Sequence, residues 1–383
     1  MKLKLYYATN RRHVGRDRLH PNSYGSKFSD DGMENLRFGV VTVQVDEVEV
    51  SHYLGKPMKN CGFGDGEALS AYLAKCAKSA EICAYEEQLT NKIHQESQES
   101  VKLGSQALFA EVELVMRKAS DVLVYIHGFN VSWTDAVGSA LGLQLMLRHA
   151  PMRDPEQDVV VVLFTWPSDG MALPWVSYKS DRTEAAGSGA AVGRAFLKVR
   201  DYLADIRDRA KKGGRAICGQ DIHLLCHSMG NYVLQNALAR VADFTPGRVL
   251  PRIFEHVFLC APDVDDNALE CDQPLENLDQ IGRQVTIYFN QEDKAMAVSD
   301  YTKGNPERLG GTGAARPTML HNKISQVDCT PVVNGLTEHS YYLTGSISAD
   351  IRASIDGWHQ DDKRRLRQRG ATTESVWVMM PAP

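Results

Sequence analysis

The stretch DIHLLCHSMGN (residues 221–231) constrains the fold of this chain more than any other. Its apolar first half predicts a buried strand, and the residues after Ser228 repeat apolar side chains at helical spacing. A serine at a sharp turn from strand to helix is a nucleophile elbow, whose usual signature is G-x-S-x-G. Here Cys226 replaces the first glycine, and it is still small enough for a close approach of strand and helix. On these residues alone, a serine that caps an ordinary helix stays open as an alternative.

Composition narrows the class of protein. The chain has 383 residues, of which 43% are hydrophobic and 24% charged, so it can bury a large core. A net charge of −5 gives no reason to expect a nucleic acid or an anionic membrane as partner. The sequence has no run of 18 apolar residues that would predict a membrane span, and the N-terminus lacks the apolar region of a signal peptide. The eight cysteines have no metal-ligand spacing, so we expect a reduced, cytoplasmic protein without metal or cofactor.

The N-terminal part predicts two strands followed by helices. Residues 3–8 and 38–45 have strand patterns and indicate an antiparallel start to a sheet. A helical pattern from Glu67 to about residue 100, with Cys76 and Cys83 on one face, is followed by a second one over 106–117. We therefore expect a helical insertion over 66–118. Covering the sheet is its simplest role, and dimerisation or lid formation remain alternatives.

From residue 121 onward, strand and helix patterns alternate, which is typical of a parallel sheet with crossover helices. Together with the elbow, this predicts an α/β-hydrolase fold, with a mostly parallel central sheet and helices on both faces. The predicted strands are 121–126, 158–166, 222–226, 253–260, 284–290 and 323–329. Asp181-x-x-Glu184 resembles a capping box and predicts the start of a long helix that runs to about Lys212.

Two segments stand outside this regular pattern. Residues 167–179 mix aromatic residues, proline and glycine, and we interpret them as a small cap over the site. We expect one domain over 1–356, with a final helix over about 340–355, and a C-terminal tail over 357–383. The charged run DDKRRLRQR in that tail predicts a solvated helix face. The apolar VWVMMP that follows could pair with an edge strand or with a second subunit in a homodimer.

Chain order selects the base that would take the proton of Ser228. In α/β-hydrolases the order is serine, acid, histidine, each on a loop at the carboxyl end of a strand. His321 precedes the last predicted strand and His359 follows the last helix, so both belong at the opposite edge of the sheet. His339 lies between that strand and that helix, where a base is needed. We therefore predict His339 as the base.

The acid that orients this histidine has two possible positions. Asp293 follows the strand over 284–290 in a short loop, NQEDKA, and its neighbour Glu292 is a weaker candidate. Asp263, Asp265 and Asp266 follow the preceding strand in APDVDD. We favour Asp293, and the earlier strand remains the alternative.

An oxyanion formed during acyl transfer needs amide donors. Met229 supplies one at the start of a helix, where the helix dipole also favours negative charge. The loop HGFN after the strand over 121–126 is expected to supply the amide of Phe129, with Asn130 as a further candidate. We expect His127 to shape this loop without titrating in catalysis.

Several motifs occur together in order along the chain. They are YYATNR (6–11), FGVVTVQV (38–45), HGFN (127–130), WPSDG (166–170), Tyr178 with Asp181, HSMGN (227–231), APDVD (261–265), NQEDKA (290–295), RLGG (308–311) and EHSYY (338–342). This set resembles a family of mostly bacterial α/β-hydrolases of long-unassigned function, distantly similar to lipases and carboxylesterases. The resemblance covers roughly residues 3–355, apart from 66–105, and implies Ser228, Asp293 and His339 as a catalytic triad. Cys226 departs from the small alanine or glycine usual in such proteins, which bears on packing more than on chemistry.

The sequence therefore predicts a serine hydrolase that cleaves a small-molecule carboxylic ester. An amidase, thioesterase or acyltransferase with the same triad is an alternative, as is an α/β-hydrolase that binds without catalysis. A haloalkane dehalogenase or epoxide hydrolase would need an aspartate nucleophile at the elbow. Candidate substrate-binding residues are Asn130, Trp166, Met171, Trp175 and Tyr178.

Overall fold

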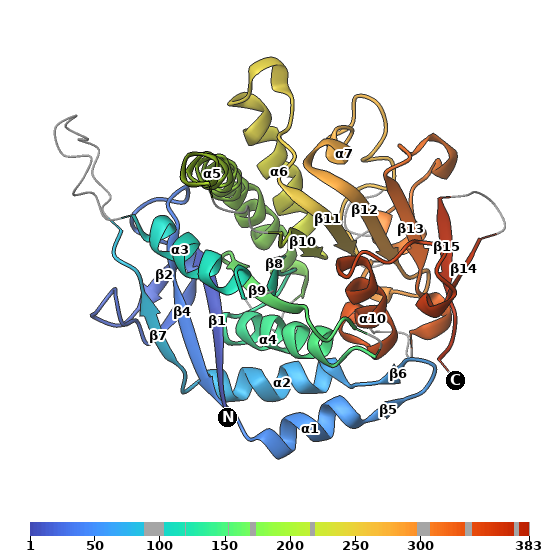
Figure 1. Ribbon diagram of the computed structural model, residues 1–383, viewed down its shortest axis with the longest axis horizontal. Coiled ribbons are helices and arrows are strands. Elements are labelled where there is room, and N and C mark those ends of the chain that lie inside the picture. The colour runs from blue at the N-terminus through green and yellow to red at the C-terminus, as the bar shows by residue number, and fades with distance from the viewer. Residues whose placement is uncertain are drawn as a thin grey trace.

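An 11-stranded, mostly parallel sheet runs through the middle of the molecule (Figure 1). The computed structural model describes this sheet and its surroundings over residues 1–87, 103–118, 120–151, 153–168, 174–214, 219–296, 307–333, 339–370 and 375–382, without the side chains of 174–177. In spatial order the strands are β14 (Arg367–Arg369), β15 (Val376–Met379), β13 (Ile324–Asp328), β12 (Gly282–Phe289), β11 (Phe254–Cys260), β10 (Ile222–His227), β8 (Ser120–Ile126), β9 (Asp158–Thr165), β1 (Lys2–Thr9), β4 (Arg37–Gln44) and β7 (Glu81–Ala84).

All neighbouring pairs from β15 through β13 to β1 are parallel, and the antiparallel pairs β15–β14, β1–β4 and β4–β7 lie at the two edges. Because parallel strands point the same way, the loops after β8, β10, β11, β12 and β13 emerge at one edge of the sheet. Two short antiparallel pairs lie outside it. They are β2 (Arg11–Val14) with β3 (Ser23–Phe28), and β5 (Pro57–Met58) with β6 (Gly62–Phe63).

Helices cover both faces of the sheet (Figure 1). One face packs against α1 (Glu47–Gly55), α2 (Gly66–Ala77), α4 (Trp133–His149) and α10 (Gly345–Ile355). The other packs against α3 (Gly104–Met116), α5 (Pro174–Gly213), α6 (Gly230–Asp243) and the short α7 (Leu278–Ile281). The remaining short helices are α9 (Leu309–Thr312) and the 3₁₀ turns Pro246–Arg248, Pro317–Met319, Thr330–Val332, Tyr341–Leu343 and Lys363–Arg365.

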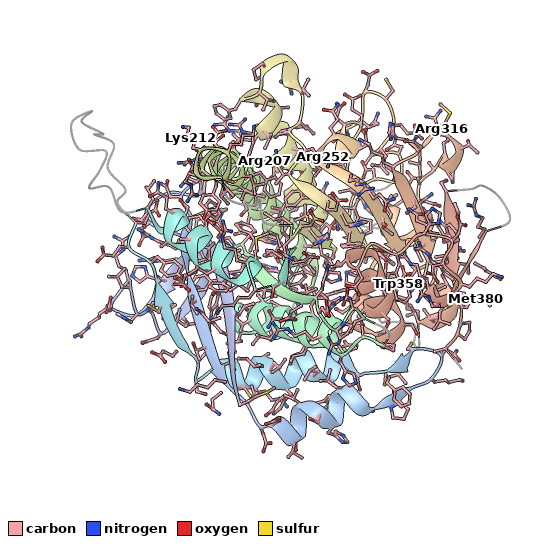
Figure 2. All side chains as sticks on the ribbon, viewed as in Figure 1. Arg207, Lys212, Arg252, Arg316, Trp358 and Met380 are labelled. Carbon is pink, nitrogen blue, oxygen red and sulfur yellow. The ribbon has the colours of Figure 1, made fainter. Side chains whose placement is uncertain are left out.

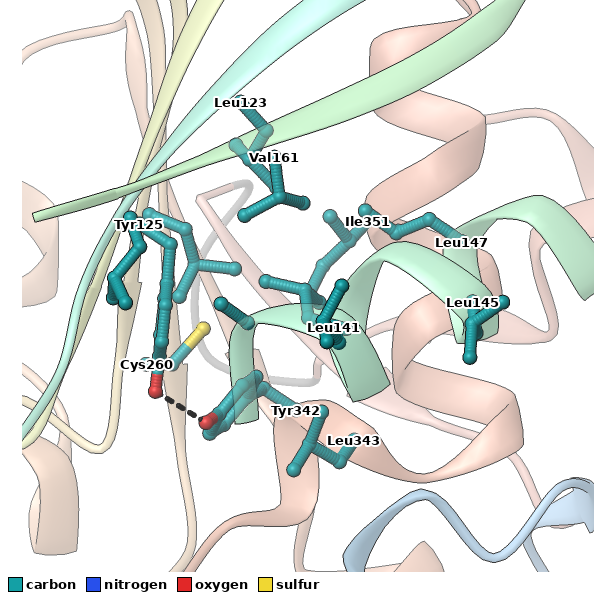
Figure 3. Packing of buried hydrophobic residues seen from close by; sticks show 14 of the residues in the cluster. Leu123, Tyr125, Leu141, Leu145, Leu147, Val161, Cys260, Tyr342, Leu343 and Ile351 are labelled. Atoms are coloured by element: carbon teal, nitrogen blue, oxygen red, sulfur yellow. Dashed lines mark hydrogen bonds between the residues drawn. The ribbon is translucent and has the colours of Figure 1, made fainter. Parts of the chain in front are cut away.

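The apolar core between β8, α4 and α10 brings the last quarter of the chain onto the centre of the sheet (Figure 3). Leu123 of β8 and Leu141 of α4 are fully buried there. Tyr125 and Tyr342 are also buried, and their hydroxyl oxygens lie 2.6 Å apart, so each phenol finds a hydrogen-bond partner inside the core. This packing fixes the chain just beyond His339.

The long helix α5 separates apolar and charged side chains as the sequence predicts. Val192 and Phe196 are buried against the sheet, whereas Arg207 and Lys212 extend from the outside of the molecule (Figure 2). The predicted start is wrong, however, because α5 begins at Pro174 and not near Asp181. Asp181 therefore lies inside the helix and does not cap it.

This earlier start also changes the interpretation of residues 167–179 as a separate cap. Residues 174–179 form the first turns of α5. Residues 169–173, with Met171, lie outside the described residues. Within the described part, the segment is the beginning of a crossover helix and packs onto the site through Tyr178 and Asp181.

The prediction of one helix from Glu67 to about residue 100 is wrong. The helix α2 ends at Ala77, and β7 pairs antiparallel with β4. In β7 the exposure alternates, with Ile82 buried and Cys83 exposed, which is the period of a half-buried strand. Cys76 and Cys83 consequently do not share a helix face. Residues 88–102 of the expected helix lie outside the described residues, and the second helix is confirmed as α3.

The C-terminal tail belongs to the folded domain. The apolar end forms β15, which pairs parallel with β13, so pairing with an edge of the sheet is confirmed. The expectation of a solvated charged helix face is wrong for Arg365 and Arg367, which are buried on the carboxylate of Asp350 in α10. The tail therefore adds two strands and a buried ion cluster. Arg365 of this cluster also donates to the backbone carbonyl of Trp358 (3.3 Å), a residue labelled in Figure 2.

Candidate active site

The strand β10 and the helix α6 meet at Ser228 in a strained turn. Ser228 has a φ of 52°, a left-handed conformation that non-glycine residues rarely adopt. Hydrogen bonds to its backbone hold it: its amide donates to the Cys260 carbonyl (2.9 Å), and its carbonyl accepts from the amide of Asp263 (3.2 Å) and from both the amide and the side-chain Nδ2 of Asn231 (3.0 Å each). The neighbouring strand β11 thus stabilises the turn.

Two glycines let the loop after β8 approach this turn. A Cβ at Gly128 would lie 2.7 Å from the Cβ of Ser228, and a Cβ at Gly230 would lie 2.6 Å from the Ile126 carbonyl oxygen. Neither contact is possible for a larger residue without a shift of the backbone. Cys226 is buried just before the turn, and burial raises the pKa of its thiol well above the usual value. It therefore acts there as a small neutral side chain.

The predicted base and the predicted acid are in contact. Nδ1 of His339 lies 2.7 Å from Oδ2 of Asp293, whose side chain is fully buried. The other carboxylate oxygen of Asp293 accepts from the amide of Ala295 at 2.9 Å. Because a carboxylate only accepts, Nδ1 carries the proton, and Nε2 of a neutral His339 is left as a proton acceptor.

His227 places this histidine beside the elbow. The two imidazole rings lie 4.8 Å apart, and Nε2 of His227 donates to the backbone carbonyl of His339 (3.2 Å). Burial, and then the charge of His339, lowers the pKa of His227 well below its usual value. His227 thus remains neutral. Among the described residues, the structure makes no hydrogen bond between the hydroxyl of Ser228 and His339.

The alternative acids have other partners. Asp263 accepts from the hydroxyl of Tyr178 (2.8 Å) and lies 3.5 Å from Nε of Arg308. Asp265 is paired with Nη1 of the same arginine. Glu292 is exposed to solvent. The structure therefore brings Asp293 to His339.

The loop after β8 offers one of the two predicted amides. In the described ranges, the amides of Phe129 and Met229 donate to no backbone carbonyl. Met229 also stands at the N-terminus of α6, where the helix dipole favours an anion. The Asn130 amide is used elsewhere, because it donates to Asp181 Oδ2 at 3.0 Å. Asn130 is therefore not a free donor.

Two of the predicted substrate-binding aromatics have structural roles. Trp166 is fully buried, stacks on His127 at a ring distance of 5.2 Å, and donates to the His127 carbonyl (2.9 Å). Its assignment to a substrate pocket is wrong, because the ring lies beneath the loop. Tyr178 is buried with its ring edge-on against Phe129, and its hydroxyl donates a hydrogen bond to Asp263. The side chain of Trp175 lies outside the described residues.

His127 is held neutral below the loop. Burial, and then the charge of Arg11, lowers its pKa well below the usual value. Nδ1 donates to the Gly128 carbonyl (2.8 Å), and Nε2 faces Thr165 Oγ1 at 2.9 Å. This agrees with the prediction that His127 shapes the loop and does not titrate.

Sequence reasoning missed the buried polar residues behind this loop, above all Arg11 and Ser168. Arg11 is 1% exposed and donates to the Val131 carbonyl at 2.7 Å. The available signal was the motif YYATNR, in which the arginine lies two residues after the end of β1. The partners that tie it to this loop, Val131, Thr165 and Ser168, are more than a hundred residues away, so no local pattern indicates them.

Comparison with known proteins places the chain in a family. A family model described as "Alpha/beta hydrolase of unknown function (DUF900)" matches residues 105–351. The chain belongs to this family. No curated protein matches it.

The α/β-hydrolase family agrees with the observed sheet, so the predicted fold and the resemblance are confirmed. Among solved structures, the chain is similar to lipase B of Aspergillus fumigatus, with 13% identity and a TM-score of 0.35 over 64% of this chain and 55% of that one. It is also similar to an acylaminoacyl peptidase of Pyrococcus horikoshii, with 13% identity and a TM-score of 0.28 over 63% and 37%. The chain thus covers less than two thirds of either protein, and likeness of this degree carries no argument about substrate.

Two further properties of this α/β-hydrolase can be read from the described residues. The one group there with metal-ligand spacing is exposed, and it consists of Cys271, Asp272 and Glu276. It includes no residue of the site at the elbow. None of the helices in these ranges is both long and apolar enough to cross a membrane.

Proposed function

We propose that the protein is a serine hydrolase that cleaves carboxylic esters through Ser228, His339 and Asp293. The observation that carries the proposal is the 2.7 Å contact between His339 and a buried Asp293, next to a strained serine elbow. A hydrogen-bonded acid and base at a nucleophilic turn is the arrangement that acyl transfer requires. A serine that only capped a helix would need neither of them.

In the first half of the reaction, Oγ of Ser228 attacks the ester carbonyl carbon while Nε2 of His339 takes the hydroxyl proton. The tetrahedral intermediate collapses, the bond to the alcohol oxygen breaks, and the leaving alkoxide takes that proton from the imidazolium. Asp293 stabilises the imidazolium and holds the ring in the required tautomer. The products of this half are the free alcohol and an acyl-enzyme on Ser228.

In the second half, water attacks the acyl-enzyme and gives its proton to Nε2 of His339. The second tetrahedral intermediate releases the carboxylic acid, and Ser228 regains its proton from the same ring. The amides of Phe129 and Met229 are proposed to stabilise both oxyanions. Each such donor is worth about 10²–10³ in kcat in a serine hydrolase.

The same machinery serves amides, thioesters and acyl acceptors other than water, so the reaction class must be measured. The decisive assay is hydrolysis of p-nitrophenyl esters of graded chain length, alongside the matched anilides and thioesters. Ester turnover that disappears in Ser228→Ala supports the proposal. Turnover of only the anilides or thioesters would move the activity to another class, and equal turnover in Ser228→Ala would refute the catalytic role of the serine.

The acid is tested by comparing Asp293→Asn with Asp265→Asn. We expect kcat to fall by several orders of magnitude in Asp293→Asn, because the asparagine no longer fixes the imidazole tautomer. Asp265→Asn, which changes a carboxylate that faces Arg308, serves as the matched control. A large loss of kcat confined to Asp265→Asn would contradict the assignment of Asp293.

A further inference from the structure

A buried carboxyl group on α5 holds the loop that carries the Phe129 amide. Asp181 is fully buried, and its Oδ2 accepts hydrogen bonds from the Asn130 amide (3.0 Å) and from the hydroxyl of Ser168. Ser168 Oγ in turn accepts from the Val131 amide at 3.1 Å. One carboxyl group thus fixes two consecutive amides directly after Phe129.

A buried guanidinium holds the same loop through its carbonyl. Arg11 donates to the Val131 carbonyl (2.7 Å) and to the Ser168 carbonyl (3.3 Å), and its Nε donates to Thr165 Oγ1 (2.8 Å). Both Arg11 and Asp181 are nearly inaccessible to solvent. Burying charged groups costs free energy, so their presence here needs a compensating role.

These contacts determine where the Phe129 amide points. His127 Nδ1 donates to the Gly128 carbonyl (2.8 Å), and in a trans peptide the N–H of Phe129 points opposite to that carbonyl. The next peptide is fixed through the Asn130 amide, which Asp181 binds while Asn130 has a left-handed φ of 57°. With both peptide planes fixed, the Phe129 amide has one direction. Gly128, packed on Ser228, places that amide beside the nucleophile.

The location of Asp181 excludes the helix-capping role that its sequence context suggests. It lies inside α5, and aspartate is a poor residue for a helix interior. Tyr178, one turn earlier, packs edge-on against Phe129 at a ring distance of 5.6 Å. The first turns of α5 therefore contact the loop through two side chains.

We propose that Asp181 is a positioning residue, which orients the Phe129 amide for the oxyanion of the reaction at Ser228. This rests on the proposed function, since an oxyanion hole has meaning only for acyl transfer. Asp181 makes no contact with a reacting atom and acts through the backbone of the loop.

The test uses three full-length variants and p-nitrophenyl butyrate, with active sites counted by titration with a fluorophosphonate. In Asp181→Ala we expect kcat per titrated site to fall by about 10- to 100-fold with little change in KM. This is less than the roughly 10²–10³ lost with a whole oxyanion donor, because the Phe129 amide is still present and only its orientation is lost. Asp181→Asn keeps a carbonyl oxygen that can accept the hydrogen bond from the Asn130 amide, so its kcat should lie between that of the wild type and that of Asp181→Ala. The matched control is Asp121→Ala, because Asp121 is also buried and accepts a backbone amide, that of Asp221 (2.9 Å), at the opposite edge of the sheet.

A second readout separates positioning from folding. A trifluoromethyl ketone that forms a tetrahedral adduct on the serine should lose affinity in Asp181→Ala by the same factor as kcat/KM. The control Asp121→Ala should keep wild-type values of both, even where its melting temperature falls. If Asp181→Ala does not fold, Ser168→Ala decides, since it removes the hydroxyl that links Asp181 to the Val131 amide, and we expect about a three- to tenfold loss of kcat.

Wild-type kcat per titrated site in Asp181→Ala, or in Ser168→Ala if that variant has to decide, would overturn the inference and leave the proposed function intact. An equal loss of kcat in Asp121→Ala would also overturn it. A wild-type protein that is neither labelled nor active would refute the proposed function, and the inference with it.

Discussion

The buried carboxylate of Asp350 makes the C-terminal tail a part of the fold, and its removal should be costly. It accepts hydrogen bonds from Arg365 Nε (2.8 Å), Arg367 Nη1 (3.1 Å) and the Tyr288 hydroxyl (2.7 Å). Burial alone would raise the pKa of Asp350, but Arg367 and Arg365 outweigh this and lower it. The group is therefore charged at neutral pH.

Asp350→Ala leaves two buried guanidinium groups without this partner. Breaking a buried ion pair in this way typically costs about 3–5 kcal/mol. Arg365 keeps bonds to the Asp350 carbonyl (3.1 Å) and to Ser354 Oγ (2.6 Å), so we expect a loss near the lower end, about 3 kcal/mol. That is a large share of the roughly 5–15 kcal/mol that stabilises a typical protein.

Urea unfolding followed by circular dichroism measures this loss. Asp361→Ala is the control, because it removes a carboxylate that pairs with Arg369 at 3.0 Å while both side chains are about half exposed. Such a surface pair is worth about 0–1 kcal/mol. Equal free energies of unfolding for Asp350→Ala and Asp361→Ala would refute the buried network.

Three further results are expected. Gly128→Ala should lower kcat about 100-fold, because its new methyl group would lie 2.7 Å from the Ser228 Cβ. Ester assays measure this loss, with a melting curve to show that the variant is folded, and an unchanged kcat would contradict the packing of Gly128 on Ser228. Cys226→Ala should retain wild-type kcat, and wild-type protein should resist thiol reagents, because burial keeps that thiol neutral; rapid inactivation by a thiol reagent at Cys226 would contradict this. Burial, and then the charge of His223, lowers the pKa of His256 to about 3 in the folded protein. In the unfolded chain this histidine takes up a proton near its ordinary pKa of about 6.5, so the free energy of unfolding should fall as the pH drops below about 6.5. Urea midpoints at pH 5 and 7.5 measure this, and a wild-type difference that persists fully in His256→Phe would exclude His256 as its source.

Much of the fold was predictable because its signals are local or depend on chain order. The elbow combines an apolar strand, a serine and a helical repeat within a few turns of chain, and it appears as β10, Ser228 and α6. The expected place of His339, between β13 and α10, needed only the rule that loops at the carboxyl ends of parallel strands share one edge. The same rule brought Asp293 to that edge.

The failures share one cause, which is a partner that lies outside the local sequence pattern. Asp181 precedes Glu184 by three residues and so imitates a capping box, but its carboxylate accepts hydrogen bonds from the hydroxyl of Ser168 and from the amide of Asn130, which lies 51 residues earlier. Arg365 lies in a charged run that predicts a solvated face. In the structure it is buried instead, because it pairs with the carboxylate of Asp350.

Two other failures have the same origin. The strand β7 has only four residues, and its pairing with β4 prevails over the helical pattern that precedes it. An aromatic residue such as Trp166 is equally compatible with a substrate pocket and with the protein core. Its stacking on His127 places it in the core.

The central claim is that Ser228 is the nucleophile, activated by His339. Labelling of the wild-type protein with a fluorophosphonate, followed by mass spectrometry of its peptides, tests this most directly. We predict one modified residue, Ser228, and labelling that is lost in Ser228→Ala and slowed by orders of magnitude in His339→Ala. Absence of label in the folded wild-type protein, or undiminished labelling of Ser228→Ala, would contradict the claim.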